Sequence, residues 1–509
     1  MVKQSLTEKT IKNSLYSVSS VIISRVGGLI FIIILARLLL PEGFGIYNLV
    51  LSIALIAITL TDLGVGTTLV RYVSEALGKN ERRKASAYIK YLFKFRFFLV
   101  MTVIFIIVIF GKFISYQIFQ KPAMYFPLLF AGFYILMQLF FGFFNAVFSA
   151  IKDLRKIALT QIVFQVFRIG LVILAISLIS DTRVVSGVFI ALAIAVFLSS
   201  LIAFIISDKK LIFGDSKKEK IDKVRVLKYL GFVSLASISL TFFGSVDTLM
   251  LGRFVEVEFL GFYGAALGVV TTIGSLFSFG GVLLPIFTQI QGDRLERGFN
   301  KVFKSIVIFT IPSVMGIIIF GKYFIRAVYG KEYLIAAIPL YALAFTIIIL
   351  PIISLYSTLF AAKEKPKVLS KFVLISLGIN IVLNFVLIRF LFGFGQEYAI
   401  LGAGIATVVS RSFFMFSLIR KSRQFTNLKG EHKFLVKPLI ASIVMAGFLI
   451  LFIYLVNITL ILGILGIILG AGIYFGVLWK IKGIEKQEIY LLKRIFIKKY
   501  RDIKTTKRL

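Results

Sequence analysis

Long runs of apolar residues follow one another along the whole chain, separated by short polar segments rich in Lys and Arg. A helix needs about 20 such residues to cross the hydrocarbon core of a bilayer. Because lipid cannot satisfy free peptide groups, runs of this length fold as helices. They lack the short alternating pattern of outer-membrane strands. The pattern predicts an all-α membrane protein with fourteen transmembrane helices, at 18–40, 45–68, 92–116, 124–150, 156–179, 185–207, 228–251, 260–288, 303–327, 334–361, 368–392, 398–419, 434–456 and 459–479.

The composition agrees with this pattern. Of the 509 residues, 59% are hydrophobic and 16% are charged, whereas soluble chains contain about 45–50% apolar and about 25% charged residues. A soluble enzyme and a disordered chain are therefore both excluded. The chain has no cysteine and a single histidine, His432. These counts exclude disulfides and thiolate chemistry and leave almost nothing for histidine catalysis or a zinc site, so we predict no metal site.

Basic residues outnumber acidic ones, with 59 Lys and Arg against 23 Asp and Glu. Most of them fall in the N-terminal tail, in every second loop and in the C-terminal tail, as the positive-inside rule requires. This pattern predicts a multi-pass protein of the cell membrane with both termini cytoplasmic. Its basic loops are expected to contact anionic membrane lipids rather than nucleic acid. The basic stretch 484–500 is interpreted as an amphipathic helix on the inner leaflet, with a solvated tail as the alternative.

A shift of 216 residues aligns the first span region with the seventh. Arg37 then pairs with Arg253, and Tyr47 pairs with Tyr263. Repeats that are six spans apart share one orientation, which predicts two six-helix lobes related by a pseudo-two-fold axis along the membrane normal. The expected domains are an N-lobe, a basic cytoplasmic linker, a C-lobe, two further helices and a basic amphipathic tail, at 1–207, 208–227, 228–419, 420–480 and 481–509.

The segment from Ser24 to Gly28, the motif Leu35 to Tyr47 (LARLLLPEGFGIY) and the motif Asp247 to Gly252 (DTLMLG) resemble polysaccharide flippases. These are the Wzx-type proteins of the multidrug/oligosaccharidyl-lipid/polysaccharide superfamily. The resemblance covers the whole chain. It implies alternating-access translocation of a lipid-linked oligosaccharide, on a polyprenyl phosphate or diphosphate carrier, from the inner to the outer leaflet. Glycan-assembly enzymes are the partners that it implies. Lipid II flippases and cation-coupled multidrug exporters share the architecture and remain alternatives.

Once the basic residues of loops and helix ends are set aside, three arginines remain inside predicted spans, where ionisable residues are usually functional. Arg25, Arg168 and Arg411 are the candidates for binding the substrate phosphate in a cavity, because a guanidinium binds phosphate oxygens in bidentate fashion and stays charged. Arg25 also matches an arginine that several family members carry in the first helix. Its alternative role is a structural pair, for example with Asp62 of the second span or with a backbone carbonyl. For Arg168 and Arg411, structural pairing is an equally open interpretation.

Two carboxylates, Asp62 and Asp247, are candidates for binding a coupling proton or Na⁺. Asp247 equally suits a packing role near the end of its helix. Polar side chains in other spans are either cavity residues or bonds between helices, the commoner use; they are Gln138, Asn145, Gln161, Gln165, Asn380 and Asn384.

Several motifs are missing from the sequence. No Gly-Lys pair is followed by Ser or Thr in a phosphate-binding loop, so ATP is not expected as a cofactor. The expected outer loops are too short for a glycan polymerase or ligase, and no nucleotide-sugar transferase motif occurs. The sequence therefore favours a transporter over an enzyme or a scaffold.

Overall fold

The structure is a computed structural model that describes residues 6–179, 183–215, 219, 221–278, 280–424, 426, 433–456 and 458–483. All regular elements in these ranges are helical. We call α1–α6 the first half, α8–α15 the second half and α16–α17 the C-terminal pair. The helices of the first half, together with α7, are α1 (Leu6–Asp62), α2 (Val65–Gly78), α3 (Arg82–Phe113), α4 (Tyr125–Ala150), α5 (Leu154–Leu178), α6 (Val184–Ile206) and α7 (Lys209–Phe213).

The second half and the C-terminal pair contain ten helices. They are α8 (Lys223–Phe254), α9 (Val257–Leu276), α10 (Gly280–Gln289), α11 (Gly292–Val328), α12 (Ala337–Leu343), α13 (Thr346–Ala362), α14 (Pro366–Phe392), α15 (Gln396–Ser422), α16 (Lys433–Leu455) and α17 (Leu460–Lys480). Short turns of π- or 3₁₀-helix occur at Ile114–Ile118, Pro122–Met124 and Lys331–Ala336.

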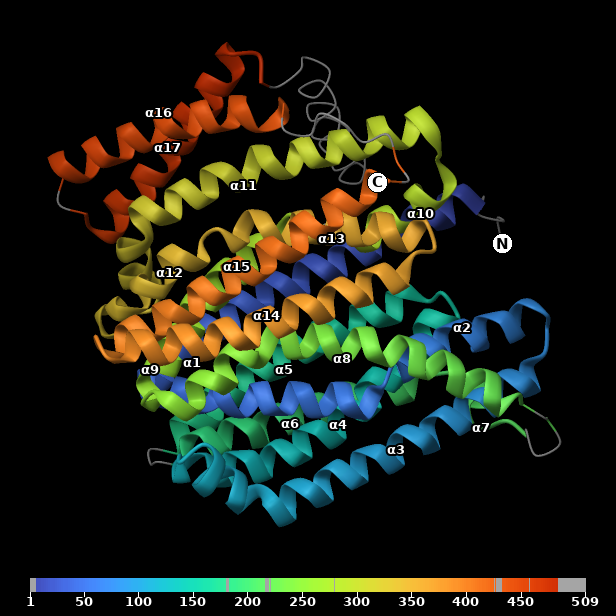
Figure 1. Ribbon diagram of the computed structural model, residues 1–509. Coiled ribbons are helices and arrows are strands. Elements are labelled where there is room, and N and C mark those ends of the chain that lie inside the picture. The colour runs from blue at the N-terminus through green and yellow to red at the C-terminus, as the bar shows by residue number, and fades with distance from the viewer. Residues whose placement is uncertain are drawn as a thin grey trace, which may run out of the picture.

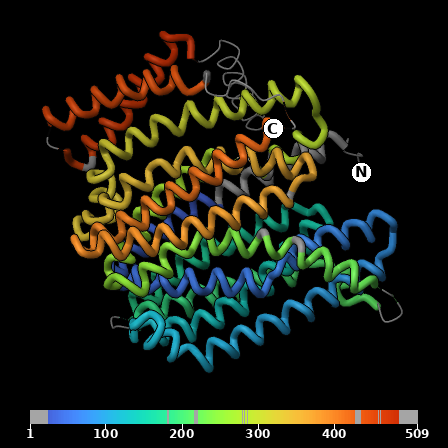
Figure 2. Tube along the Cα trace, in the orientation of Figure 1, coloured from blue at the N-terminus to red at the C-terminus, as the bar shows by residue number. Residues whose placement is uncertain are grey.

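The long helices lie roughly side by side and cross the molecule in alternating directions (Figure 1). The first part of α1 runs through the middle of the bundle, and α16 and α17 lie at one edge, beyond α11. The main contact between the two halves is made by α1 and α9. Figure 2 shows that the α2–α3 turn and α7 lie at one end of the molecule, whereas the start of α9 lies at the opposite end. We call these the basic end and the far end.

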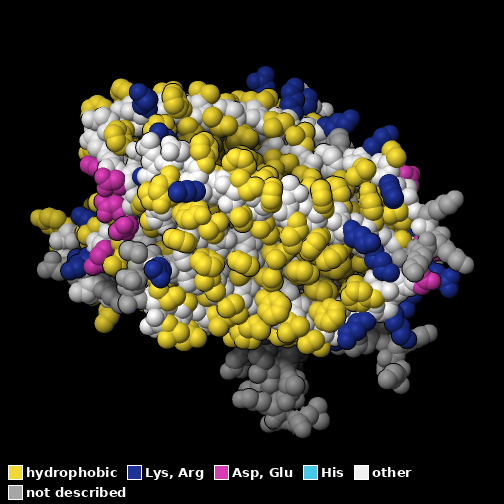
Figure 3. All heavy atoms as spheres, turned by 90° about the horizontal axis from the view of Figure 1, so that it is seen from below, with side chains coloured by type: hydrophobic (Ala, Val, Ile, Leu, Met, Phe, Trp, Pro, Cys, Tyr) yellow, Lys and Arg dark blue, Asp and Glu magenta, His cyan; other side chains and the backbone are white. Residues whose placement is uncertain are grey.

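The outer surface is apolar between these two ends (Figure 3). Basic side chains gather toward the basic end of the face in view, and a group of acidic side chains lies at the far end. Twelve helices among the described residues are long and apolar enough to span a membrane, or thirteen if the bent pair Lys331–Leu343 and Thr346–Ala362 forms one span. The chain is therefore a multi-pass membrane protein.

The count of twelve or thirteen differs from the predicted fourteen because residues 24–78 count once. Leu40, at φ 57° and ψ 173°, interrupts the helical geometry of α1. A straight helix of 57 residues would be about 85 Å long, more than twice the thickness of a bilayer core. Figure 1 instead shows two separate helices before and after this point. Leu40 adopts a backbone conformation that is almost exclusive to glycine and costs about 1–3 kcal/mol.

Two predicted spans are interrupted in their interior. The range 334–361 contains α12 and α13, and the chain bends by 47° between Leu343 and Thr346. The range 260–288 was expected to be a single helix, but it contains α9 and α10 with a break after Leu276. The break leaves carbonyl groups at the end of α9 without partners in their own helix. The predicted amphipathic helix at 484–500 lies outside the described residues.

At the far end, the second part of α1 meets the start of α9 with backbone against backbone. A Cβ added to Gly45 would lie 1.8 Å from the carbonyl oxygen of Val257, and one added to Gly261 would lie 2.0 Å from that of Pro41. Only glycine permits this approach. The two helices therefore join the halves at a contact in which no side chain intervenes.

Candidate functional site between the two halves

Arg25 lies in the first part of α1 and reaches across to the second half. Its two terminal nitrogens donate hydrogen bonds to the carbonyl oxygens of Ser275 and Ser278, the latter at 3.2 Å. Both carbonyls lie at the α9–α10 break, where the negative end of the helix dipole favours a cation. The side chain is half-buried. Arg25 thus links the two halves, and its charged side chain remains partly accessible.

Of the two structural partners that the sequence suggested for Arg25, the structure shows backbone carbonyls and not Asp62. Asp62 forms an ion pair with Arg96 of α3, with 3.0 Å between Oδ1 and Nη1. The Arg96 side chain is 6% exposed and that of Asp62 is 30% exposed. The charge pattern of the sequence predicts that Arg96 is one of the cytoplasmic basic residues that set topology. In the structure Arg96 lies inside the first half. The reason is that α3 begins at Arg82, more than two turns before the predicted span 92–116.

Arg168 and Gln165 of α5 fix the part of α1 that carries Arg25. Gln165 Nε2 donates to the carbonyl of Ser24 at 3.2 Å, and Arg168 Nη2 donates to the carbonyl of Gly27 at 3.2 Å. The Arg168 guanidinium also bonds the side chain of Gln165 and lies 4.2 Å from the centre of the Phe31 ring. These contacts stay within the first half. They position α1 on either side of Arg25.

Asp247 of α8 lies at the centre of a buried polar network in the second half. It is 1% exposed and accepts hydrogen bonds from Tyr263 OH at 3.0 Å, from Asn384 Nδ2 at 2.8 Å and from Thr407 Oγ1. The donors come from α9, α14 and α15. The carboxylate thus connects four helices of the second half.

Arg411 lies one helical turn after Thr407 on α15 and is 6% exposed. Its Nη1 has no hydrogen-bond partner among the described residues. Asn380 Nδ2 donates to Ser410 Oγ at 3.1 Å, and its Oδ1 likewise has no partner in the described part of the chain. Arg411 and Asn380 therefore belong to the second half and lie on different helices from Arg25 and Arg168.

The other polar candidates are dispersed. Asn145 bonds the carbonyl of Phe141 and the hydroxyl of Thr160, so it connects α4 with α5. Gln138 bonds Tyr134 within α4. Gln161 is half-exposed on α5, one turn before Gln165. The structure thus gathers Arg25, Arg168 and Gln165 in one place, Asp247, Asn380, Asn384 and Arg411 in a second, and Asp62 in a third.

An apolar groove begins near the α9–α10 break. A cavity of about 300 Å³ is lined by Ile273 of α9, by Phe277 directly after this helix, and by residues of α11, α16 and α17. A second cavity of about 510 Å³ continues between α11 and α17. The two share Phe320, Phe324 and Ile467. Sequence patterns could not reveal this groove, because its apolar residues resemble those that face lipid.

A second arginine of α1 repeats the geometry of Arg25 at the far end. Arg37 donates from Nε to the carbonyl of Val328 at 2.6 Å and from Nη2 to that of Ala327 at 2.5 Å, where α11 ends. Nearby, Tyr333 OH donates to the carbonyl of Ala36 at 2.7 Å. The first part of α1 is therefore bonded to the second half at two levels, 12 residues or about 18 Å apart along the helix.

Comparison with known families now adds to these observations. Residues 10–291, more than half of the chain, match the family described as polysaccharide biosynthesis protein. The chain belongs to this family. Its computed structure resembles that of the lipid II flippase MurJ in an inward closed conformation, with a TM-score of 0.70 and 16% identity over 91% of this chain and 97% of MurJ. It also resembles an inward-facing multidrug resistance MATE transporter of the MOP superfamily, with a TM-score of 0.62 and 13% identity over 81% and 95% of the two chains.

Curated relatives of this family member have been named for glycan pathways. The chain is 26% identical over 270 residues to the probable low-salt glycan biosynthesis flippase Agl15 of Haloferax volcanii, covering 52% of this chain and 54% of that protein. It is 29% identical over 102 residues to the teichuronic acid biosynthesis protein TuaB of Bacillus subtilis, covering 19% and 20% of the two chains. The alignment with the first relative thus spans about half of its length.

Proposed function

We propose that this protein is a flippase that moves a lipid-linked oligosaccharide, on a polyprenyl phosphate or diphosphate carrier, from the inner to the outer leaflet by alternating access. The observation that carries the proposal is the contact of Arg25 with the α9–α10 break. A sugar-phosphate headgroup cannot cross hydrocarbon without cationic and polar partners. Arg25 is a partly accessible cation whose partners within the described part of the chain are backbone carbonyls.

In the proposed mechanism, Arg25 exchanges these carbonyls for phosphate oxygens. The carbonyls of Ser275 and Ser278 hold the guanidinium when no substrate is bound. A phosphate offers stronger, charge-assisted bonds to the same nitrogens. Binding of substrate therefore releases the tie that Arg25 makes between the halves. Arg168 and Gln165 act by holding α1 in place during this exchange.

The groove along α11 and α17 suits the hydrocarbon carrier of the substrate. It starts at Ile273 and Phe277, next to the carbonyls that bind Arg25, and it is lined almost entirely by apolar side chains. Exposed residues such as Ile464 and Phe475 border it on the outer surface. A carrier chain can lie there while its phosphate reaches Arg25.

The orientation and the number of spans are part of the proposal. We infer that the basic end faces the cytoplasm, with both termini on that side. Counting α1 as two spans on either side of Leu40, and the bent pair at Lys331–Ala362 as one, gives fourteen spans. The reciprocal approach of Gly45 and Gly261 supports two lobes related by a pseudo-two-fold axis, with α16 and α17 outside them.

We further propose that transport is coupled to H⁺ or Na⁺ without ATP, and that the protein catalyses no bond-making step. Asp62 is better placed than Asp247 to carry the coupling ion. Its side chain is 30% exposed and has one partner, whereas Asp247 is 1% exposed and has three donors. Glycan-assembly enzymes are the partners that such a flippase would serve.

A leaflet-accessibility assay in proteoliposomes tests the function. The substrate is a fluorescent polyprenyl diphosphate oligosaccharide, and a membrane-impermeant quencher reports the fraction in the outer leaflet. We expect the native protein to flip this lipid and Arg25→Ala to lose at least tenfold in rate, while Arg25→Lys retains part of the activity.

Arg37→Ala is the matched control, because Arg37 also bonds the carbonyls at a helix end. Equal losses for Arg25→Ala and Arg37→Ala would show that Arg25 only ties the halves together, and wild-type rates for Arg25→Ala would overturn the proposed phosphate site. Transport of cationic drugs in place of the glycan lipid would favour a multidrug exporter.

A further inference from the structure

A separate pocket of about 630 Å³ lies in the first half, between α3, α4, α6 and α7. It shares no lining residue with the groove along α11 and α17. Half of its lining residues are phenylalanines, and Lys90 and Ser200 are its polar lining residues. Its volume lies within the range of pockets that bind small ligands. An apolar pocket of this size suits a hydrocarbon chain.

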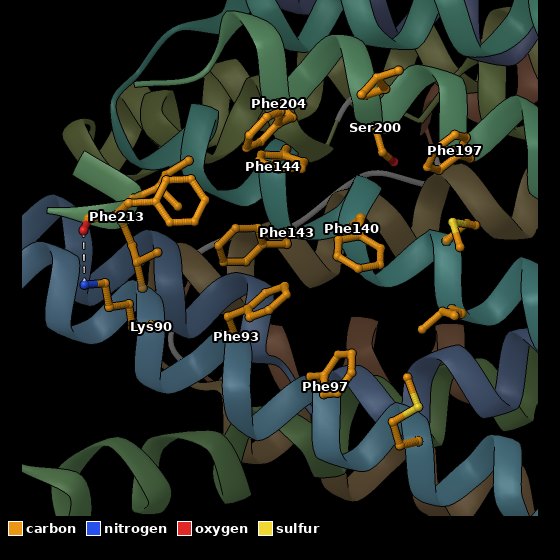
Figure 4. Close-up of a pocket in the computed structure, with 16 residues that line it drawn as sticks. Lys90, Phe93, Phe97, Phe140, Phe143, Phe144, Phe197, Ser200, Phe204 and Phe213 are labelled. Carbon is orange, nitrogen blue, oxygen red and sulfur yellow. Dashed lines mark hydrogen bonds between the residues drawn. The ribbon is translucent and has the colours of Figure 1, made fainter. Parts of the chain in front are cut away.

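The pocket opens on the outer surface of the first half. Phe97, Phe197 and Leu201 line it and are 39%, 48% and 43% exposed, respectively. All three belong to helices that span the membrane. Lipid chains are thus the molecules that contact this opening. In Figure 4 the rings of Phe93, Phe140 and Phe143 lie within the pocket, on the inner side of this rim.

One end of the pocket carries positive charge. Lys90 Nζ donates to the carbonyls of Phe213 at 3.3 Å and Gly214 at 2.7 Å (Figure 4). An ammonium group has three donors, so one is left for a ligand. Lys209 Nζ lies 5.4 Å from the centre of the Phe204 ring, which also lines the pocket. The charged end is therefore formed by α3 and α7.

The remainder of the lining is apolar. Met101, Leu136 and Met137 line the pocket farther along α3 and α4, away from Lys90 in the direction of the far end. Charge at one end and hydrocarbon along the rest match a molecule with an anionic head and a long apolar chain. Anionic lipids gain about 1 kcal/mol from each basic residue near a membrane surface.

We infer that this pocket binds one anionic membrane lipid, with its phosphate at Lys90 and Lys209 and a hydrocarbon chain between α3, α4 and α6. A second copy of the chain is a poor occupant, because two such faces would bring like charges together. The carrier lipid of the substrate is also less suited, because the pocket has no residue in common with the Arg25 site. Ser86 Oγ bonds the carbonyl of Gly214 at 3.1 Å, so α7 is already fixed to α3 at the head of this site.

Native mass spectrometry of the purified full-length protein tests the inference. Phosphatidylglycerol and phosphatidylcholine with identical chains are titrated separately. We expect the anionic lipid to bind more tightly. Lys90→Gln and Lys209→Gln should each weaken its binding about fivefold and leave phosphatidylcholine unchanged. Lys371→Gln, an exposed lysine of α14, is the control and should change neither affinity.

Filling the pocket provides the second arm. Met137→Trp should lower the affinity for both lipids at least tenfold, whereas Phe416→Trp, at a 62% exposed site on α15, should not. If Met137→Trp proves unstable, a photoactivatable phosphatidylglycerol replaces it and should label the Met101 and Met137 regions of the native protein. None of these variants touches Arg25 or its partners, so the result is independent of the flipping assay.

Five outcomes would overturn the inference. Equal lipid retention by native protein and Met137→Trp would indicate surface lipid alone, as would labelling spread evenly over the helices. The proposed site for an anionic headgroup would be wrong if the two lipids bound with equal affinity and the lysine variants did not change these affinities. Displacement of phosphatidylglycerol by lower concentrations of polyprenyl phosphate would assign the pocket to the carrier. Loss of dimers in Met137→Trp without loss of lipid would assign it to a second copy.

Discussion

Gly45 and Gly261 contact each other's helix in the same way: each faces the backbone carbonyl of the residue four positions before the other, Val257 and Pro41. The two glycines are 216 residues apart, the offset at which the first spans repeat. A sequence repeat and a reciprocal contact thus coincide at one place. Tyr47 and Tyr263, at the same offset, are both buried nearby.

This contact makes an alanine at either glycine costly. A Cβ at 1.8 or 2.0 Å from a carbonyl oxygen forces backbone movement, and such overpacking destabilises by about 1–3 kcal/mol. We expect Gly45→Ala and Gly261→Ala to lower the melting temperature in detergent by similar amounts. The double variant should lose less than the sum, because both changes widen one contact. Gly472→Ala, where an added Cβ meets nothing within 4 Å, should be neutral or stabilising.

The Asp62–Arg96 pair predicts an asymmetry between two substitutions. Asp62→Asn leaves a 6% exposed guanidinium without a counter-charge, which costs about 3–5 kcal/mol. Arg96→Met leaves a carboxylate that is 30% exposed and stays hydrated, so it should cost less. Chemical denaturation in detergent measures both. Asp153→Asn, in the exposed pair with Lys156, should change stability by no more than about 1 kcal/mol.

Asp62→Asn also tests ion coupling. We expect this variant to lose the acceleration of flipping that a proton or sodium gradient gives to the native protein. Flipping driven by substrate concentration alone should persist. A gradient response identical to that of native protein would assign Asp62 a structural role.

Asp247 is expected to be structural, because three donors from three helices already surround it. Asp247→Asn weakens these charge-assisted bonds, and each is worth about 1.5–3 kcal/mol when the acceptor is ionised. The melting temperature should fall, and Asn384→Ala should lower it as well. The pH profile of flipping per folded molecule should stay unchanged in both variants; a flattened profile in Asp247→Asn alone would show that this carboxylate carries the ion.

The bonds of Arg37 and Tyr333 should hold the far end closed. Because the chain has no cysteine, Asn48→Cys can report on this contact, where the Asn48 side chain packs against Gly264. Arg37→Ala combined with Tyr333→Phe removes three bonds of about 1 kcal/mol each and should raise the labelling rate at position 48 more than tenfold. Lys79→Cys, on the exposed α2–α3 turn, should label at one rate in both backgrounds. No change at position 48 would mean that backbone packing alone closes this end.

The succession of helices could be predicted from the sequence because lipid selects for long apolar runs, and most observed helices follow the predicted ranges. The partners of the charged residues could not be predicted. In helices such as α5 and α8 the apolar residues are not confined to one face, because lipid and protein interior accept the same side chains. Nothing in the sequence therefore shows that Asp62 turns toward Arg96 and Arg25 toward α9. The break at Leu40 does have a local signal, because Pro41 follows it and a proline disfavours helical geometry at the residue before it. The predicted ranges accordingly separate two spans there, whereas they carry one span through the break after Leu276.

The strained backbone of Leu40 favours rearrangements of α1 in which this residue relaxes. The residue lies three positions after Arg37, between the two arms of α1, in a conformation that costs a leucine about 1–3 kcal/mol. The packing at the far end maintains this unfavourable geometry. Any rearrangement that frees the turn recovers that energy, which is enough to shift an equilibrium between two conformations about five- to 150-fold. Strain in the backbone of Leu40 therefore favours opening of the far end. Relaxation of this one residue would supply part of the free energy that opening requires.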